Sequence, residues 1–193
     1  LGSLISSIEW QSLDENHNRD SAHIIYNIIE FRVHIYSANA MQPGGGHIPF
    51  PERITRSKGV VNPLNEDDYC FLWAAYLGIL DLSHTKNYSR PSDITKLVRE
   101  QGVQLNCSLQ MPVEPTEKNF KQFEKENPGI KLNVYSTAEE AEKSPIKPLY
   151  IGTNQTLKII NLLYHKNEEG RAHYGFIKNM SRVIHQATRH GGK

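Results

Sequence analysis

The spacing of apolar residues changes near Ile130, and this change limits the folds open to the chain of 193 residues. Upstream, residues 70–80 form an apolar run rich in Leu and Ala that is long enough for a buried helix, and residues 92–98 and 116–127 show helical spacing behind Ser92 and Thr116 as N-caps. Downstream, short β-branched and aromatic runs alternate with turn residues, which is typical of strands. The predicted strands are 130–135, 148–151, 157–164 and 172–178. We therefore expect an α+β fold with helices first and a C-terminal antiparallel sheet, followed by a short helix starting at Ser181.

Charge and composition narrow the possible partners. Lys and Arg number 22 against 21 Asp and Glu, so the formal net charge of +1 gives no field that would attract nucleic acid or a membrane surface. No apolar run approaches the roughly 20 residues that a bilayer span needs. The start at Leu1-Gly2-Ser3 resembles an excised end rather than a targeting signal. We expect a monomeric intracellular domain, cytoplasmic or nuclear, that belongs to a longer protein and binds neither nucleic acid nor membranes.

Three segments are expected along the chain. Residues 1–46 form an N-terminal arm, with a strand predicted over residues 24–35. Residues 47–185 form the main domain, and residues 186–193 form a basic tail. Three glycines and alternating prolines over residues 44–51 exclude a helix there and predict a loop that crosses the surface.

Cys70 is the first candidate for chemistry because it begins the predicted helix behind a polar turn. Backbone N–H groups and the helix dipole at such a position favour a thiolate, and the polar turn would leave the sulfur accessible. Cysteines at the start of apolar helices are also often buried in the core, so a structural role is the alternative. If Cys70 is a nucleophile, it should react with iodoacetamide far faster than Cys107, which we interpret as structural.

His173 is the candidate general base, since it begins the last predicted strand and a rigid strand would fix its ring. Its alternative is a surface histidine. A hairpin loop of about five residues would place Asn161 opposite His173, where its side chain would orient the imidazole. Asn179, farther along the same strand, is a weaker candidate for that role. His165 is expected in the turn, and no histidine spacing suits a metal, so no metal or cofactor is expected.

Asn65 and Asp67 lie in the polar turn before Cys70. The Asn65 amide would donate to an oxyanion alongside the backbone N–H of Cys70, although an asparagine in such a turn often serves the turn alone. Asp67 is expected to cap the helix that Cys70 begins.

Several stretches resemble a domain found in long reading frames of eukaryotic mobile elements. They are HIPFP at 47–51, VVNPLNEDDYCFLW at 60–73, NLLY at 161–164 and HYGFIKNMSR at 173–182. That domain is similar to the viral-tegument-like deubiquitinases, a papain-fold group related to the large tegument proteases of herpesviruses. The ovarian-tumour deubiquitinases are similar too, with Asp three residues before the nucleophile and a Leu-Leu-Tyr strand followed by His-Tyr.

The resemblance implies a papain-like cysteine peptidase fold, with Cys70 as nucleophile, His173 as base, and ubiquitin or polyubiquitin as the partner. Arg171 stands where the tegument proteases carry the aspartate of their triad, so Asn161 or a Cys-His dyad would have to serve. Asn65 corresponds loosely to their oxyanion glutamine. The expected activity is hydrolysis of isopeptide bonds after the C-terminal glycine of ubiquitin. The alternatives are a peptidase that processes the element's own polyprotein and a non-catalytic protein-binding module.

Overall fold

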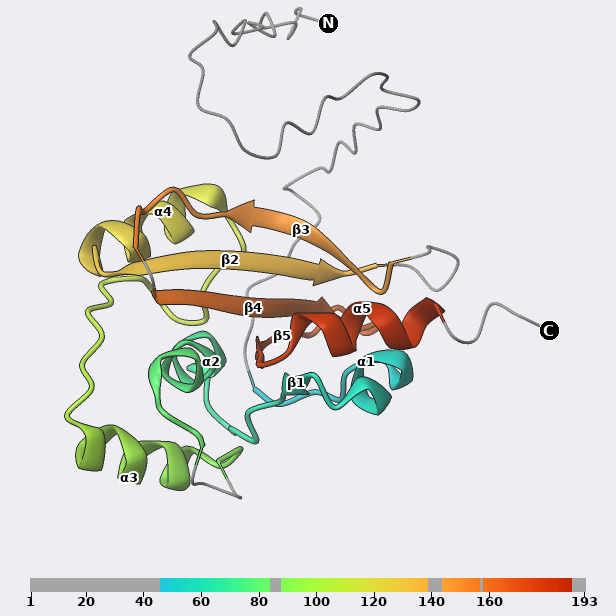
Figure 1. Cartoon of the computed structure of the whole chain (residues 1–193), viewed down its shortest axis with the longest axis horizontal. Coiled ribbons are helices and arrows are strands. Elements are labelled where there is room, and N and C mark those ends of the chain that lie inside the picture. The colour runs from blue at the N-terminus through green and yellow to red at the C-terminus, as the bar shows by residue number, and fades with distance from the viewer. Residues whose placement is uncertain (1–45, 84–87, 139–143, 157, 189–193) are drawn as a thin grey trace, which may run out of the picture. The chain divides into compact units, whose positions relative to one another are not determined.

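The computed structural model describes residues 46–83, 88–138, 144–156 and 158–188, which form a mixed α+β fold around a five-stranded sheet (Figure 1). The helices are α1 (Glu52–Ser57), α2 (Cys70–Ile79), α3 (Pro91–Gln101), α4 (Glu117–Glu126) and α5 (Met180–Thr188). The strands are β1 (Val60–Val61), β2 (Ile130–Thr137), β3 (Ile146–Ile151), β4 (Lys158–Lys166) and β5 (Ala172–Ile177). The predicted arm strand at 24–35 lies outside the described residues, and the first residues of the predicted tail belong to α5.

The sheet has the order β1-β5-β4-β2-β3 and is mixed rather than purely antiparallel. Figure 1 shows β2 and β4 side by side and running in the same direction. The expectation of an antiparallel sheet is therefore wrong for this pair. The reason is that β3 folds back antiparallel along the outer edge of β2, which returns the chain to the side where β2 began. The strand β4 then starts from that side and runs parallel to β2.

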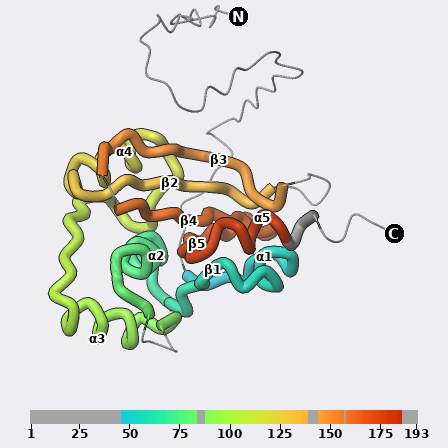
Figure 2. The backbone as a smooth tube through the Cα atoms, in the orientation of Figure 1, coloured from blue at the N-terminus to red at the C-terminus, as the bar shows by residue number. Residues whose placement is uncertain are grey.

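Each face of the sheet has its own apolar cluster. Side chains of α2 and α4 pack on the even-numbered residues of β4 and β5, including Leu162 and Tyr174. Side chains of α1 and α5, which lie side by side in Figure 2, pack on odd-numbered residues such as Leu163 and Ile177. Because alternate residues of a strand point to opposite faces, two neighbouring residues of β5 belong to different clusters.

Helix starts follow the expected capping rules in one case and depart from them in another. The Thr116 hydroxyl accepts the N–H of Asn119 at 3.3 Å, which confirms Thr116 as the N-cap of α4. The prediction of Ser92 as the N-cap of α3 is wrong by two residues, because Pro91 occupies the first helical position and Arg90 precedes it. Proline suits that position, since its fixed φ is helical and its missing N–H would have no partner there.

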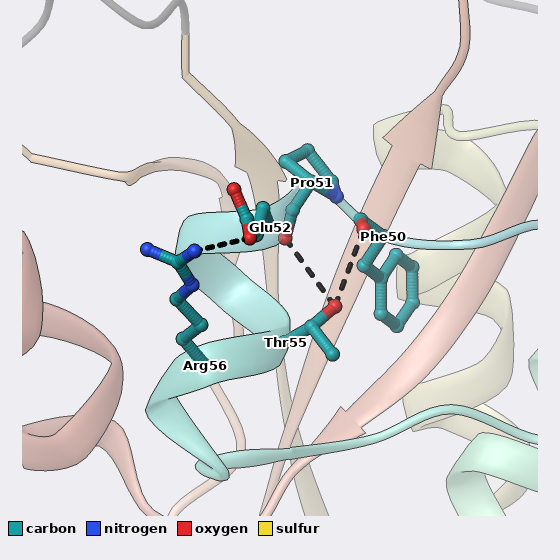
Figure 3. A network of polar contacts seen from close by, with 5 residues as sticks. All are labelled: Phe50, Pro51, Glu52, Thr55 and Arg56. Carbon is teal, nitrogen blue, oxygen red and sulfur yellow. Dashed lines mark hydrogen bonds and ion pairs between the residues drawn. The ribbon is translucent and has the colours of Figure 1, made fainter.

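The segment before α1 is packed rather than loose on the surface. Ile48 and Phe50 are buried while His47 and Pro49 are exposed, so the segment alternates like a strand with one proline toward solvent. Residues 46–51 form neither helix nor strand, as predicted, but the loop packs two side chains into the core instead of only crossing the surface. Figure 3 shows how the segment turns into α1: the Thr55 hydroxyl donates to the carbonyls of Phe50 at 3.2 Å and Pro51 at 3.4 Å. An ion pair joins Glu52 to Arg56 on the exposed side of the helix.

In the parts of the chain that the structure describes, none of the helices combines the length and the apolar character needed to span a lipid bilayer.

Candidate active site

Cys70 begins α2, and its side chain lies against β5. The thiol is fully buried, and the backbone N–H groups of Tyr174 and Phe71 are hydrogen-bonded to the sulfur. The Phe71 ring packs edge-on against the Tyr174 ring, with centroids 5.2 Å apart. Since His173 is the residue before Tyr174, the start of the helix and the backbone of the histidine strand are direct neighbours.

Burial controls the ionisation of Cys70. Desolvation raises the pKa of the Cys70 thiol to about 12, against the lowering effect of the Tyr174 and Phe71 N–H groups, and the charges of Asp67 and Asp68 raise it further. The expectation of an accessible thiolate is therefore wrong for this conformation. The helix terminus favours the charged form, but burial in the cluster under α2 outweighs it.

We accordingly expect iodoacetamide to modify Cys107 faster than Cys70, the reverse of the order that the sequence indicates. Cys107 is only half-buried, and although desolvation also raises the pKa of its thiol, the sulfur is more accessible than that of Cys70. At pH 7.5 iodoacetamide should modify Cys107 about tenfold faster or more, because rate follows both exposure and thiolate fraction. Mass spectrometry of peptides over time measures both rates. Faster labelling of Cys70 would mean that the α2 start opens without a ligand.

His173 lies buried on β5, on the opposite face from Tyr174. Its ring meets the His47 ring edge-on, with centroids 5.7 Å apart, and the Phe50 ring at 5.8 Å. Gly175, two residues further along the same face, has no room for a side chain, since a Cβ there would lie 2.6 Å from the Phe50 ring. A carboxylate from that position of β5 is therefore excluded, and the ring of His173 is held by packing against two aromatic rings.

Asn161 does not face His173. The register of β4 and β5 pairs His173 with His165, four residues beyond Asn161, and the side-chain Oδ1 of Asn161 accepts a hydrogen bond from Asn133 Nδ2 at 3.0 Å. The prediction of Asn161 as the orienting residue is wrong, because β4 continues to Lys166 and the loop of about five residues therefore lies later in the chain, at 167–171.

His165 lies on β4 rather than in the turn where the sequence placed it. A hydrogen bond of 2.9 Å joins its Nδ1 to the Thr137 hydroxyl, and burial lowers the pKa of its imidazole. Arg171, which stands at the position of the tegument aspartate, is exposed and forms an ion pair with Glu169 at 2.9 Å. The position of the tegument aspartate therefore supplies no carboxylate to His173 in this chain.

The turn before Cys70 is organised by Asp67. Its Oδ1 accepts the N–H of Tyr69 and the indole N–H of Trp73, each at 3.0 Å, so Asp67 holds the turn against α2. The prediction that Asp67 caps the helix is wrong, because Tyr69 occupies the N-cap position and no side chain caps it. Asn65 donates its amide hydrogens to the carbonyl and the carboxylate of Asp67 at 2.6 and 3.0 Å. Both Asn65 donors are therefore engaged, which contradicts their expected role toward an oxyanion in this conformation.

No protein family, curated protein or solved structure matches this chain.

His47, for which the sequence indicates no role, contacts both the turn before Cys70 and the ring of His173. Its Nδ1 is hydrogen-bonded to the Pro63 carbonyl at 3.0 Å, its backbone N–H donates to the Asn65 carbonyl at 2.9 Å, and its ring covers that of His173. Apolar residues at the alternate positions 48 and 50 are a sequence signal for packing of this segment, but they do not predict the contact between His47 and His173, which depends on distant segments.

Proposed function

We propose that this domain is a papain-like thiol peptidase that removes ubiquitin from modified proteins, with Cys70 as nucleophile and His173 as general base. The observation that carries the proposal is the packing of the start of α2 on β5, where Cys70 and Tyr174 belong to one apolar cluster and the Tyr174 N–H lowers the pKa of the Cys70 thiol. It places a cysteine at a helix start beside the backbone of the histidine-bearing strand, whereas the His173 imidazole packs against Phe50 on the other face of that strand. Catalysis by a thiol needs the imidazole within hydrogen-bond reach of the sulfur, so opening of the site by substrate has to bring the two together. The resemblance of residues 47–182 to the viral-tegument-like deubiquitinases supplies the substrate class.

The reaction follows the usual course for a thiol and an imidazole. Once the opened site brings the His173 imidazole to the sulfur, His173 takes the proton of the Cys70 thiol, and the sulfur attacks the carbonyl carbon of the last glycine of ubiquitin. The C–N bond then breaks, and His173 returns the proton to the departing lysine amine. Water hydrolyses the resulting thioester and restores the thiol. Because the Asn65 donors are engaged with Asp67, backbone N–H groups at the start of α2 are the donors left in that turn for the oxyanion.

The resting site is closed, and substrate must open it. Burial and the raised pKa keep Cys70 a neutral thiol, so a small electrophile should react with it slowly. Binding energy from a folded substrate that contacts the surface around the α2 start is able to drive such an opening. Leu64 and Tyr69, which flank the turn and are 46% and 48% exposed, offer apolar contacts for that purpose.

A non-catalytic protein-binding module is the second candidate, and the burial of Cys70 favours it. In that case the thiol is one more member of the apolar cluster under α2, and the turn from Leu64 to Tyr69 is a contact surface without chemistry.

Covalent capture separates the two candidates. Ubiquitin with a C-terminal vinyl electrophile should form a conjugate with the wild-type chain and with Cys107→Ala, but not with Cys70→Ala, whose fold should persist because one sulfur is lost from the core. Gel shift and circular dichroism measure conjugation and folding. No conjugate with a folded wild-type chain, or a conjugate that depends on Cys107 instead, would show that the deubiquitinase proposal is wrong.

A further inference from the structure

His47 is fixed at three points although its ring is exposed. Its backbone N–H and its Nδ1 bind the Asn65 and Pro63 carbonyls, both in the turn that leads to Cys70. Its ring packs edge-on against His173, with an interplanar angle of 81°. Fixing an exposed side chain in one rotamer costs conformational entropy, and the three contacts of His47 offset that cost. The same contacts connect the turn before Cys70 to the His173 ring on β5.

The hydrogen bond to Pro63 also fixes the tautomer of His47. A carbonyl oxygen only accepts, so Nδ1 carries the hydrogen and Nε2 of the neutral ring carries the lone pair. The His47 ring therefore has a defined orientation as well as a defined position. In an edge-to-face contact the positive edge of one ring lies on the negative face of the other, so the orientation of His47 selects an orientation of His173.

We propose that His47 is the positioning residue for His173 and takes the place of the third member of a catalytic triad. The inference rests on the proposed function for its catalytic meaning. The three positions that the sequence indicates for a third residue are engaged elsewhere: Asn161 lies four residues out of register, Asn179 accepts the N–H of Arg182 at the start of α5 at 2.9 Å, and Arg171 pairs with Glu169. His47 instead orients the imidazole from the segment before α1, through ring contact and without a carboxylate.

Two substitutions separate the ring contact from the tether. His47→Asn keeps an amide N–H that is able to reach the Pro63 carbonyl but removes the ring, whereas His47→Phe keeps a ring against His173 but removes the donor. On a ubiquitin substrate with a C-terminal fluorophore, we expect His47→Asn to lower kcat about tenfold or more with KM changed less than about twofold, because orienting a base acts on the transition state. His47→Phe keeps the ring contact without the tether, so its kcat should lie between those of His47→Asn and the wild type. His185→Asn, the same change at an exposed position of α5, is the matched control and should behave as wild type.

A second measurement does not depend on cleavage of ubiquitin. Imidazole NMR signals of His173 in the ligand-free chain should shift in His47→Asn, shift less in His47→Phe, and not change in His185→Asn. Unchanged His173 signals and an unchanged kcat in His47→Asn would overturn the positioning role, as would a larger loss in His47→Phe than in His47→Asn. Failure of the wild-type chain to capture the ubiquitin electrophile would instead overturn the proposed function, so the two failures are distinguishable.

Discussion

Replacing Gly152 by alanine is expected to lower the free energy of unfolding by about 3 kcal/mol or more, at the upper end of what overpacking costs. A Cβ at this position would lie 2.0 Å from Glu124 Oε1 and 2.6 Å from the Leu132 carbonyl oxygen. Neither neighbour is able to retreat, because the Glu124 carboxylate is buried and accepts the Leu132 N–H and the Tyr150 hydroxyl, each at 2.7 Å. The added methyl group must therefore displace β2 or break this network.

Urea unfolding of Gly152→Ala and of Gly129→Ala provides the test. Gly129 is the matched control because nothing lies within 4 Å of a Cβ built there, so its substitution should change the free energy of unfolding by less than about 0.5 kcal/mol. Glu124→Ala should also destabilise the fold by about 3 kcal/mol, since it leaves several buried donors without their acceptor. A Gly152→Ala chain with the unfolding midpoint of the wild type would show that Glu124 does not occupy this space in solution.

Much of the secondary structure is predictable from the sequence because each element carries a local signal. The helix at Cys70 follows a polar turn, and the strands after Ile130 have β-branched residues bounded by turns, so their positions are confirmed to within a few residues. The short helix α1 gives no such signal, since only Ile54 and Ser57 of its six residues are buried. The parallel pairing of β2 and β4 depends on where β3 folds back, which no local pattern reports.

The candidate site is predictable only in part, because its geometry depends on contacts between distant segments. A register error of four residues keeps Asn161 on the same face as His173 but moves it roughly 13 Å along the strand. The apolar run that predicts α2 does not say whether the first residue of the helix faces solvent or core. The prediction that Cys70 begins the helix is confirmed. The prediction of an accessible thiolate is wrong because Cys70 faces the core, where burial raises the pKa of its thiol.

Ubiquitin with a C-terminal fluorophore should be hydrolysed with a kcat/KM at least about a thousandfold above that of a peptide containing only the Leu-Arg-Gly-Gly tail. The reason lies in the closed site. A neutral, buried Cys70 has to be opened and ionised before it attacks, and raising a thiol pKa from about 9 to about 12 makes the thiolate roughly a thousand times rarer at neutral pH. A short tail has few contacts with which to offset that cost, whereas the folded body of ubiquitin has many.

The comparison also separates a deubiquitinase from a peptidase that processes a polyprotein. A polyprotein peptidase recognises side chains over several residues of a linear site and should cleave a short peptide that spans the site, with ubiquitin chains left intact. Cys70→Ala serves as the blank for both substrates, and Cys107→Ala as the control that retains activity. Equal kcat/KM values for ubiquitin and the tail peptide would contradict the substrate-driven opening of the site. Cleavage of a polyprotein site without cleavage of any ubiquitin substrate would keep Cys70 and His173 as a peptidase pair and remove ubiquitin as its substrate.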